Sequence, residues 1–257
     1  PATSRDCEDE LFPQLLVERP RHPAALPLRE LALRLLLEHQ RAGARVVALA
    51  STHRAAGATG IALNVARALT GHGLRVLLVE LPCPQPRLAA YAGLGGVAPP
   101  QSGWAGRHDD PHSPCELIPW HPAASAGDVR GSLEDFLGGA RASYDLVLLD
   151  APTPLAEDTS HLACLHADTV VLIARQDAAH YRDVRKLVEW LAEARVPALS
   201  ALLNFAAPIR LEAFTHESLN RAQELLATSR GRLQARCADT ASKVAERIRA
   251  SRTGRNQ

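Results

Sequence analysis

The residues best suited to chemistry form a short turn between a compact apolar run and a helix-like run. The turn reads Ser51-Thr52-His53-Arg54-Ala55-Ala56-Gly57-Ala58-Thr59-Gly60. A phosphate-binding turn follows the pattern GxxxxGK[ST]: backbone amides cradle phosphate, the lysine neutralises its charge and the serine or threonine holds Mg²⁺. Gly57 and Thr59 stand where the second glycine and the hydroxyl belong, but Ala58 occupies the lysine position. The turn therefore has the outline of a phosphate site without its principal cation.

The missing lysine decides what chemistry we expect. The chain has only two lysines, Lys186 and Lys243, and neither lies in the turn, so Arg54 is the one cation there that could substitute. Phosphoryl transfer depends almost wholly on positioning and charge stabilisation, and one lost donor can cost about 10²–10³ in rate. We therefore expect little hydrolysis, with ATP and Mg²⁺ kept as an alternative. The residues of this degenerate nucleotide site are Arg54, Gly57, Ala58, Thr59, Gly60 and the later Asn204.

The segments that must position this turn predict an α/β fold. Residues 45–50, 60–70 and 75–80 read as strand, helix and strand, a βαβ unit whose strands are parallel. Further strands are predicted at 116–120, 146–150, 169–174 and 199–205, and further helices at 27–40, 129–143 and 181–194. Strands that are apolar throughout are buried on both faces. The pattern thus predicts a doubly wound, mostly parallel sheet with an N-terminal helix.

Composition divides the chain into three predicted parts. Residues 1–25, rich in proline and charge, are expected to be flexible or loosely docked; 26–207 form the α/β domain; 208–257 form a helical extension with a basic tail. Apolar residues of the extension recur at helical spacing, at Leu219, Ala222, Leu226, Leu233, Cys237, Ala241, Val244 and Ile248. This stripe either packs on the sheet or contacts a partner helix. The tail is either a solvated helix face or a contact for an anionic membrane.

Bulk composition narrows the class of protein. The 257 residues are 46% hydrophobic and 22% charged, as in a folded soluble protein, and a net charge of +1 favours no nucleic-acid partner. Five scattered cysteines without a CxxC pair indicate a reducing compartment. No apolar run approaches the ~20 residues of a membrane span, and the polar opening is unlike a signal peptide. We expect a cytoplasmic protein, either free or peripheral to the inner membrane.

The longer context of the turn carries a family resemblance. The run VVALASTHRAAGATGIALNVARALTGHGLRVLLVELPCPQPRL resembles the P-loop region of bacterial tyrosine kinases, the cytoplasmic kinases of capsule and exopolysaccharide systems within the MinD/ParA-like ATPase group. The segments CELIPWHPA and YDLVLLDAPTPLAEDTSHLACLHADTVVLIAR are similar to later parts of the same domain. Glu30 and Arg34 stand where that family carries an oligomerising Glu/Arg motif, only part of which is retained. The resemblance spans about residues 26–205 and implies the P-loop fold.

Departures from the family pattern fall on the residues that would carry its chemistry. The family's second strand ends in an Asp-x-Asp that supports Mg²⁺, and these positions are Glu80 and Pro82 here. Asp150, at the end of the Walker B strand, is retained and could hold metal-bound water. The C-terminal tyrosine cluster is absent, since the only tyrosines are Tyr91, Tyr144 and Tyr181. Glu80 and Asp150 are therefore read as vestigial catalytic residues.

Two weaker patterns have competing explanations. His108, His112, Cys115 and His121 have spacings that permit zinc, but the chain contains eleven histidines and a polar loop explains them as well. We predict no metal site there. Asn204 resembles the family's contact to the nucleotide base, although an asparagine at a strand end is equally a turn former.

The resemblance and its departures together predict a pseudo-kinase or pseudo-ATPase that regulates or scaffolds exopolysaccharide synthesis or export. Its expected partner is a membrane polysaccharide co-polymerase or synthase subunit, a paralogue, or a second copy of the chain. One alternative is an active ATPase or tyrosine kinase that uses Arg54, Glu80 and Asp150. The other is a MinD/ParA-like positioning protein that touches the membrane through its basic tail.

Overall fold

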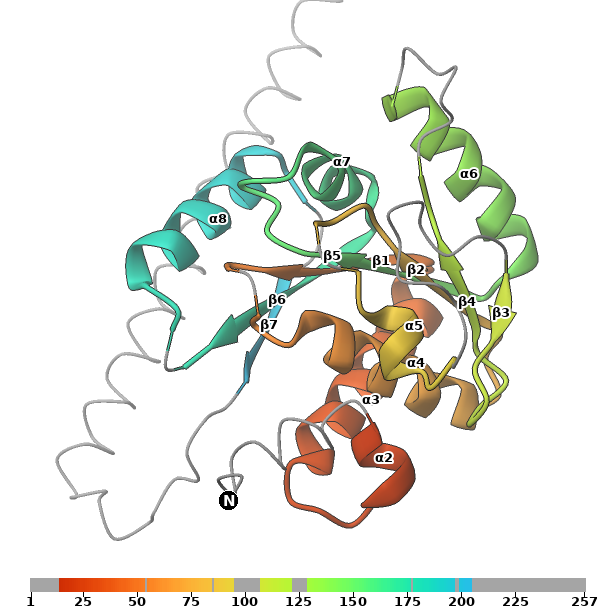
Figure 1. Ribbon diagram of the computed structural model, residues 1–257. Coiled ribbons are helices and arrows are strands. Elements are labelled where there is room, and N and C mark those ends of the chain that lie inside the picture. The colour runs from red at the N-terminus through yellow and green to blue at the C-terminus, as the bar shows by residue number, and fades with distance from the viewer. Residues whose placement is uncertain are drawn as a thin grey trace, which may run out of the picture. The chain divides into compact units, whose positions relative to one another are not determined.

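The computed structural model describes residues 14–53, 55–84, 86–94, 107–121, 129–176, 178–196 and 199–204. Seven strands occur in these ranges: β1 Val46–Ser51, β2 Val76–Glu80, β3 His108–Asp109, β4 Glu116–Pro119, β5 Leu146–Ala151, β6 Thr169–Arg175 and β7 Leu199–Asn204. They form one sheet in the order β3-β4-β2-β5-β1-β6-β7 (Figure 1). Every pairing is parallel except that of β3 with β4. The predicted doubly wound, mostly parallel sheet is confirmed.

Helices cover both faces of this sheet. They are α2 Leu15–Glu18, α3 Ala25–Ala42, α4 Ala58–Gly71, α5 Leu88–Tyr91, α6 Val129–Ser143, α7 Asp158–His166 and α8 Tyr181–Glu193. Helices α3 and α4 lie on one face, and α6, α7 and α8 lie on the other (Figure 1). The crossover connections of parallel strands require this arrangement.

Two hydrophobic cores result from the alternation of side chains along each strand. In β1, Val47 and Leu49 belong to the core on the α3–α4 face, which we call the α4 core. Val46, Ala48 and Ala50 belong to the core on the opposite face, which we call the α6 core. Because both faces of the central strands are buried, polar residues have no place until the strands end. Polar side chains that could do chemistry are therefore found at the ends of the strands.

Short elements escaped prediction. Helix α7 was not expected because its sequence, DTSHLACLH, has no apolar stripe at helical spacing, although Ser160, Ala163 and Cys164 are buried. The two-residue strand β3 and the single-turn helices α2 and α5 are too short for a periodic signal. The other predicted strands and helices are present, with ends that differ by one or two residues.

The first described residues of the N-terminal stretch contact the α/β domain. Leu15 is buried in the α4 core, and the Leu16 amide donates to Asn64 Oδ1 at 3.0 Å. The Gln14 side-chain amide donates to the Tyr91 carbonyl at 2.8 Å. Residues 14–16 thus contact the domain, whereas residues 17–24 are exposed. Residues 1–13 and the proposed extension 208–257 lie outside the described residues, so those boundaries stay predictions.

Two aspartates fix the amino-terminal edge of the sheet. Asp145, before β5, accepts the Arg75 amide and its guanidinium, and Asp168, before β6, accepts the amides of Arg45 and Val46. The Arg75 hydrogen bonds lower the pKa of Asp145 to about 2. For Asp168, burial raises the pKa, but hydrogen bonds from Arg141 and the two amides outweigh it, so the pKa falls below its ordinary value. These carboxylates tie adjacent strand starts together.

None of the helices in the described part of the chain combines the length and apolar character required to cross a bilayer.

Candidate functional site

The phosphate-type turn lies where β1 ends and α4 begins, at the carboxyl-terminal edge of the parallel strands. Gly57, which precedes α4, has φ 85°, and Ala55 has φ 59°. Such left-handed conformations are favourable for glycine and costly for alanine. The Ile61 amide donates to the Gly57 carbonyl at 3.0 Å and starts the helix. This edge is the usual ligand site of open α/β sheets, and a helix N-terminus there favours anions.

The lysine position of the turn is occupied by a buried alanine. Ala58 is the first residue of α4, is 7% exposed and packs within the α4 core. A methyl group there offers no hydrogen bond and no charge to a phosphate. Arg54, the substitute cation considered from the sequence, lies outside the described residues.

The Thr59 hydroxyl and the Asp150 carboxyl are in direct contact. Thr59 Oγ1 donates to Asp150 Oδ2 at 2.6 Å, and Asp150 is 2% exposed. Its other oxygen, Oδ1, is buried without a hydrogen-bond partner among the described residues. Burial raises the pKa of Asp150 to about 7; the Thr59 hydrogen bond opposes the rise, and the nearby Glu80 carboxylate adds to it. This carboxyl is costly to ionise and has one acceptor oxygen that no described residue uses.

Glu80 is already engaged by the chain. It lies beside Asp150 in the register of β2 with β5, and is 4% exposed. Its Oε1 accepts the amides of Arg87 and Leu88 at 2.7 and 2.8 Å, and so holds the start of α5. Glu80 therefore positions the loop after β2, and the following Pro82 offers no side-chain ligand.

Side chains at the ends of β6 and β7 contact the backbone of the turn. Asn204 Nδ2, at the end of β7, donates to the Ala56 carbonyl at 2.8 Å. Arg175 Nη1, at the end of β6, reaches the Ala55 carbonyl at 3.4 Å. Asn204 thus holds the backbone of the turn, and its predicted contact to a nucleotide base stays a prediction. Arg175 was missed from the sequence, although its place at the end of a strand beside β1 was a usable signal.

Thr153 adds a second unusual group at this edge. It has φ 47°, a strained conformation for a β-branched residue, and its amide donates to Ser51 Oγ at 3.4 Å. Its hydroxyl is buried and, like Asp150 Oδ1, has no hydrogen-bond partner among the described residues. Strain and unmatched polar atoms cluster at functional sites more than elsewhere.

These residues fit ATP and Mg²⁺ only in part. Thr59 and Asp150 are together, as a metal with its water would require, and Asp150 has a free oxygen. The residues that would contact phosphate do not fit, because position 58 is apolar and buried. Glu80 Oε1 already accepts two backbone amides at the start of α5. The described part of the turn thus has a glycine in the left-handed conformation before α4 and no cation at position 58.

Other residues singled out from the sequence do not form a site. Within the described ranges, no group of three or more His, Cys, Asp or Glu side chains is arranged to hold a metal. His112 and His121 are exposed, whereas Cys115 is buried and burial raises the pKa of its thiol. Cys164 is buried in the α6 core. The centroid of the His161 ring lies 4.1 Å from that of the Trp190 ring.

Sequence comparisons identify relatives with a shared name. The chain is 26% identical over 215 residues to a tyrosine-protein kinase named EpsB from Ralstonia nicotianae, and 25% identical to its namesake from Ralstonia solanacearum. Each match covers 76% of this chain, which spans 27% of the length of these curated relatives. No family model matches the chain.

Solved structures share the fold at lower identity. The kinase domain of Escherichia coli tyrosine kinase ETK superposes with a TM-score of 0.59 at 17% identity, over 79% of this chain and 83% of that one. The chimerical protein CapA2B2 gives 0.65 at 17% identity, over 80% and 100%, and the BceF tyrosine kinase domain gives 0.57 at 20% identity, over 74% and 80%. The predicted resemblance to bacterial tyrosine kinases is therefore confirmed.

Proposed function

We propose that this chain, a relative of bacterial tyrosine kinases that shares the fold of their kinase domains, is a non-catalytic regulator or scaffold of exopolysaccharide synthesis or export. It acts in the cytoplasm by contacting partners rather than by turning over ATP. The proposed partner is a membrane polysaccharide co-polymerase or synthase subunit, a paralogue, or a second copy of the chain.

The observation that carries this proposal is the buried methyl group of Ala58 within an otherwise preserved turn. Gly57 keeps the left-handed conformation that opens α4, and Thr59 keeps its contact with Asp150. The turn therefore has the backbone of a phosphate site, but the residue at the lysine position is an alanine that packs in the α4 core. Retention of a framework without its charge favours a binding role over phosphoryl transfer.

Restoring the cation tests the proposal directly. The unmodified chain is expected to show no saturable heat with ATP and Mg²⁺ in calorimetry at micromolar concentrations. We expect Ala58→Lys to tighten ATP binding by about 10- to 150-fold, the equivalent of about 1.5–3 kcal/mol for a charge-assisted contact. Ala58→Met is the matched control, because it adds length without charge and should give no gain.

The rival reading of an active ATPase is favoured by one contact, that of Thr59 with Asp150. It predicts phosphate release by the unmodified chain, abolished by Asp150→Asn. Mg²⁺-dependent ATP binding at micromolar affinity without any change at position 58 would overturn the non-catalytic proposal.

Helix α3 supplies a surface for a partner. Leu26, Leu33 and Leu37 are 59%, 45% and 42% exposed, and their spacing of seven and four residues places them on one side of the helix. Glu30 and Arg34, where the resemblance implies an oligomerising motif, lie among them. Exposed leucines in a row on one helix are a common feature of contact surfaces. We infer that the chain self-associates through α3.

A double variant tests this surface. Leu33→Gln with Leu37→Gln should shift the chain from dimer or larger species to monomer in sedimentation equilibrium, with little effect on folding because both side chains are already partly in water. Leu165→Gln, which changes a leucine of α7 that is 44% exposed, is the control and should leave the association unchanged. A monomeric unmodified chain would contradict the inference.

A further inference from the structure

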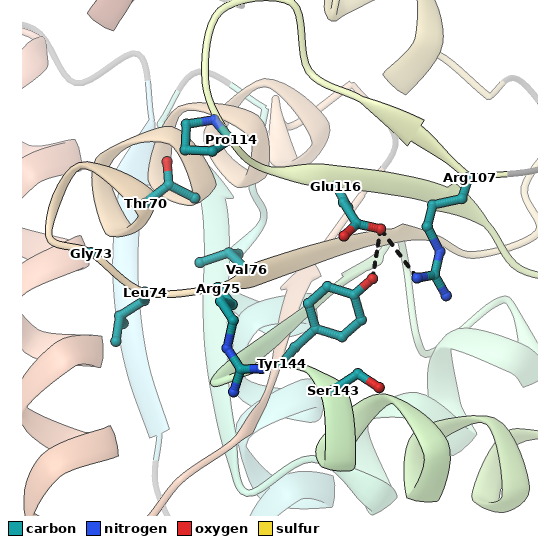
Figure 2. A pocket seen from close by; sticks show the side chains of 10 residues that line it. All are labelled: Thr70, Gly73, Leu74, Arg75, Val76, Arg107, Pro114, Glu116, Ser143 and Tyr144. Atoms are coloured by element: carbon teal, nitrogen blue, oxygen red, sulfur yellow. Dashed lines mark hydrogen bonds and ion pairs between the residues drawn. The ribbon is translucent and has the colours of Figure 1, made fainter.

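A pocket of about 370 Å³ opens at the amino-terminal edge of the sheet (Figure 2). Its lining comes from the α4–β2 connection, the segment around β4, and the α6–β5 connection. The lining residues are Thr70, Gly73, Leu74, Arg75, Val76, Arg107, Pro114, Glu116, Ser143 and Tyr144. Its volume is within the range of sites for small molecules, about 300–1,000 Å³.

This pocket is separate from the phosphate-type turn. Val76 and Glu116 begin β2 and β4, and Tyr144 precedes β5, whereas the turn follows the last residue of β1. Since these strands are parallel, the pocket and the turn lie at opposite edges of the sheet. A ligand here would not compete with one at the turn.

A hydrogen-bonded cluster forms one wall of the pocket. Tyr144 Oη donates to Glu116 Oε2 at 2.7 Å, and Arg107 Nη1 approaches the same oxygen at 3.2 Å (Figure 2). The Arg107 guanidinium also lies 5.7 Å from the centre of the Tyr144 ring. Burial and the Glu116 carboxylate raise the pKa of Tyr144 to about 12, so its hydroxyl keeps its proton at neutral pH. The cluster therefore orients both the carboxylate and the guanidinium.

Arg75, Arg107 and Glu116 each have side-chain atoms that could form further hydrogen bonds. Arg75 directs Nε and Nη2 to Asp145, which leaves Nη1, and its side chain is 65% exposed. Arg107, 57% exposed, has one contact to a carboxylate and several remaining N–H groups. Glu116 Oε1 accepts no hydrogen bond from the described residues. The pocket thus combines cationic donors with a carboxylate acceptor.

The remaining lining residues leave room and add weak acceptors. A Cβ added to Gly73, which has φ +84°, would meet no atom within 4 Å. The hydroxyls of Thr70 and Ser143 donate to the carbonyls of Arg67 and Gly139, so their oxygens are available to accept. Leu74, Val76 and Pro114 supply apolar surface.

We propose that this pocket binds a small hydroxylated anion of the sugar-phosphate class. Guanidinium groups of Arg75 and Arg107 would hold the anionic oxygens, and Glu116 with the two hydroxyl oxygens would accept hydrogen bonds from the ligand's hydroxyls. An uncharged sugar lacks an anionic group for the arginines, and an inorganic anion lacks the set of hydroxyls that a sugar offers to Glu116 and the two hydroxyl oxygens. The two kinds of lining group therefore select a ligand that has both.

Calorimetry with glucose 1-phosphate on the full chain tests this site. We expect saturable binding that Arg107→Gln weakens by about tenfold or more, since a charge-assisted hydrogen bond is lost. Glucose should bind at least about tenfold more weakly, as should inorganic phosphate. Arg130→Gln, which changes an exposed arginine of α6 outside the lining, is the matched control and should bind like the unmodified chain.

Three outcomes would overturn the assignment. The first is the absence of saturable heat with glucose 1-phosphate at millimolar concentrations. The second is equal binding of glucose 1-phosphate by Arg107→Gln and the unmodified chain. Glu116→Gln, which keeps the shape of the side chain but removes its charge, is a second variant for the same comparison. The third is equal affinity for inorganic phosphate, which would remove the recognition of hydroxyls. Thermal unfolding of each variant verifies that it is folded.

Discussion

Asp150→Asn should stabilise the folded chain at about pH 8 by about 2–4 kcal/mol. The pKa of Asp150 rises from its ordinary 3.8 to about 7 in the fold, and each pKa unit corresponds to about 1.4 kcal/mol. Asparagine has nearly the same shape and can still accept the Thr59 hydrogen bond, but it carries no charge to bury. Its unmatched N–H reduces the gain, so the value of about 4 kcal/mol is an upper bound.

The pH dependence gives this prediction its sign. Between about pH 4 and pH 7 the unfolded carboxyl is ionised while the folded one keeps its proton, so the free energy of unfolding of the unmodified chain falls as pH rises through this range. Above about pH 7 the penalty is complete and constant. The advantage of Asp150→Asn should therefore be near zero at about pH 4 and full at about pH 8, as measured by urea unfolding at each pH.

Asp145→Asn provides the opposite case at the other end of β5. The pKa of Asp145 is lowered to about 2, so its carboxylate stabilises the fold above its ordinary pKa and loses this effect as pH falls toward 2. Asp145→Asn should lower the free energy of unfolding by less than about 1 kcal/mol near neutral pH, because Arg75 is 65% exposed and water screens the ion pair. Parallel pH profiles for Asp150→Asn and the unmodified chain would show that burial does not raise the pKa of Asp150.

Asp110→Ala is expected to destabilise the chain by about 3–5 kcal/mol. Asp110 and Arg67 form a buried ion pair through two hydrogen bonds, of 2.6 and 2.8 Å, and their side chains are 0% and 4% exposed. The Arg67 guanidinium also donates to Gln14 Oε1 at 2.8 Å. Loss of the carboxylate would leave a guanidinium buried without its counter-charge, and urea unfolding at neutral pH measures the cost.

A double variant separates this buried charge from simple loss of packing. Arg67→Met combined with Asp110→Ala removes both charges, so it should be more stable than Asp110→Ala alone. Glu189→Ala breaks an exposed pair with Arg185, whose side chains are 61% and 58% exposed, and should change stability by less than about 1 kcal/mol. Equal losses in Asp110→Ala and the double variant would mean that the ion pair is not the cause.

This ion pair also matters for the candidate site. Arg67 lies in α4, the helix that begins at the turn, and Asp110 lies between β3 and β4, where it also accepts the Ser113 hydroxyl at 3.0 Å. With Gln14, the pair links the helix of the turn to the N-terminal stretch and to the edge of the sheet. The three segments are therefore positioned together.

Much of the fold followed from local pattern. The strands of the central sheet are apolar along their whole length, so burial on both faces and parallel pairing could be inferred from the order of residues alone. The helix at 129–143 was placed with its final bounds because its apolar side is distinct. Helix α7 was missed because it is buried through small residues such as Ala163, which leave no periodic signal.

The site was predictable in its list of residues and less so in their roles. The exchange of lysine for Ala58 is visible in the sequence, since motif positions are fixed by chain spacing. That Glu80 holds the start of α5, and that Asn204 holds the Ala56 carbonyl, required the strands to be assembled. Neither Arg175 nor Thr153 was singled out, because their importance comes from contacts across the sheet edge.

By itself the sequence determined the parallel α/β framework, the resemblance to bacterial tyrosine kinases and the alanine at the position where the phosphate-binding pattern has lysine. These properties depend on residue type and spacing along the chain, which need no knowledge of distant neighbours. Only the tertiary structure decided that Asp150 is a buried carboxyl with a raised pKa, that Arg67 and Asp110 form a buried ion pair, and that Arg107 and Glu116 line a pocket. Burial, hydrogen-bond partners and pKa all depend on groups that are far apart in sequence and come together only when the sheet forms.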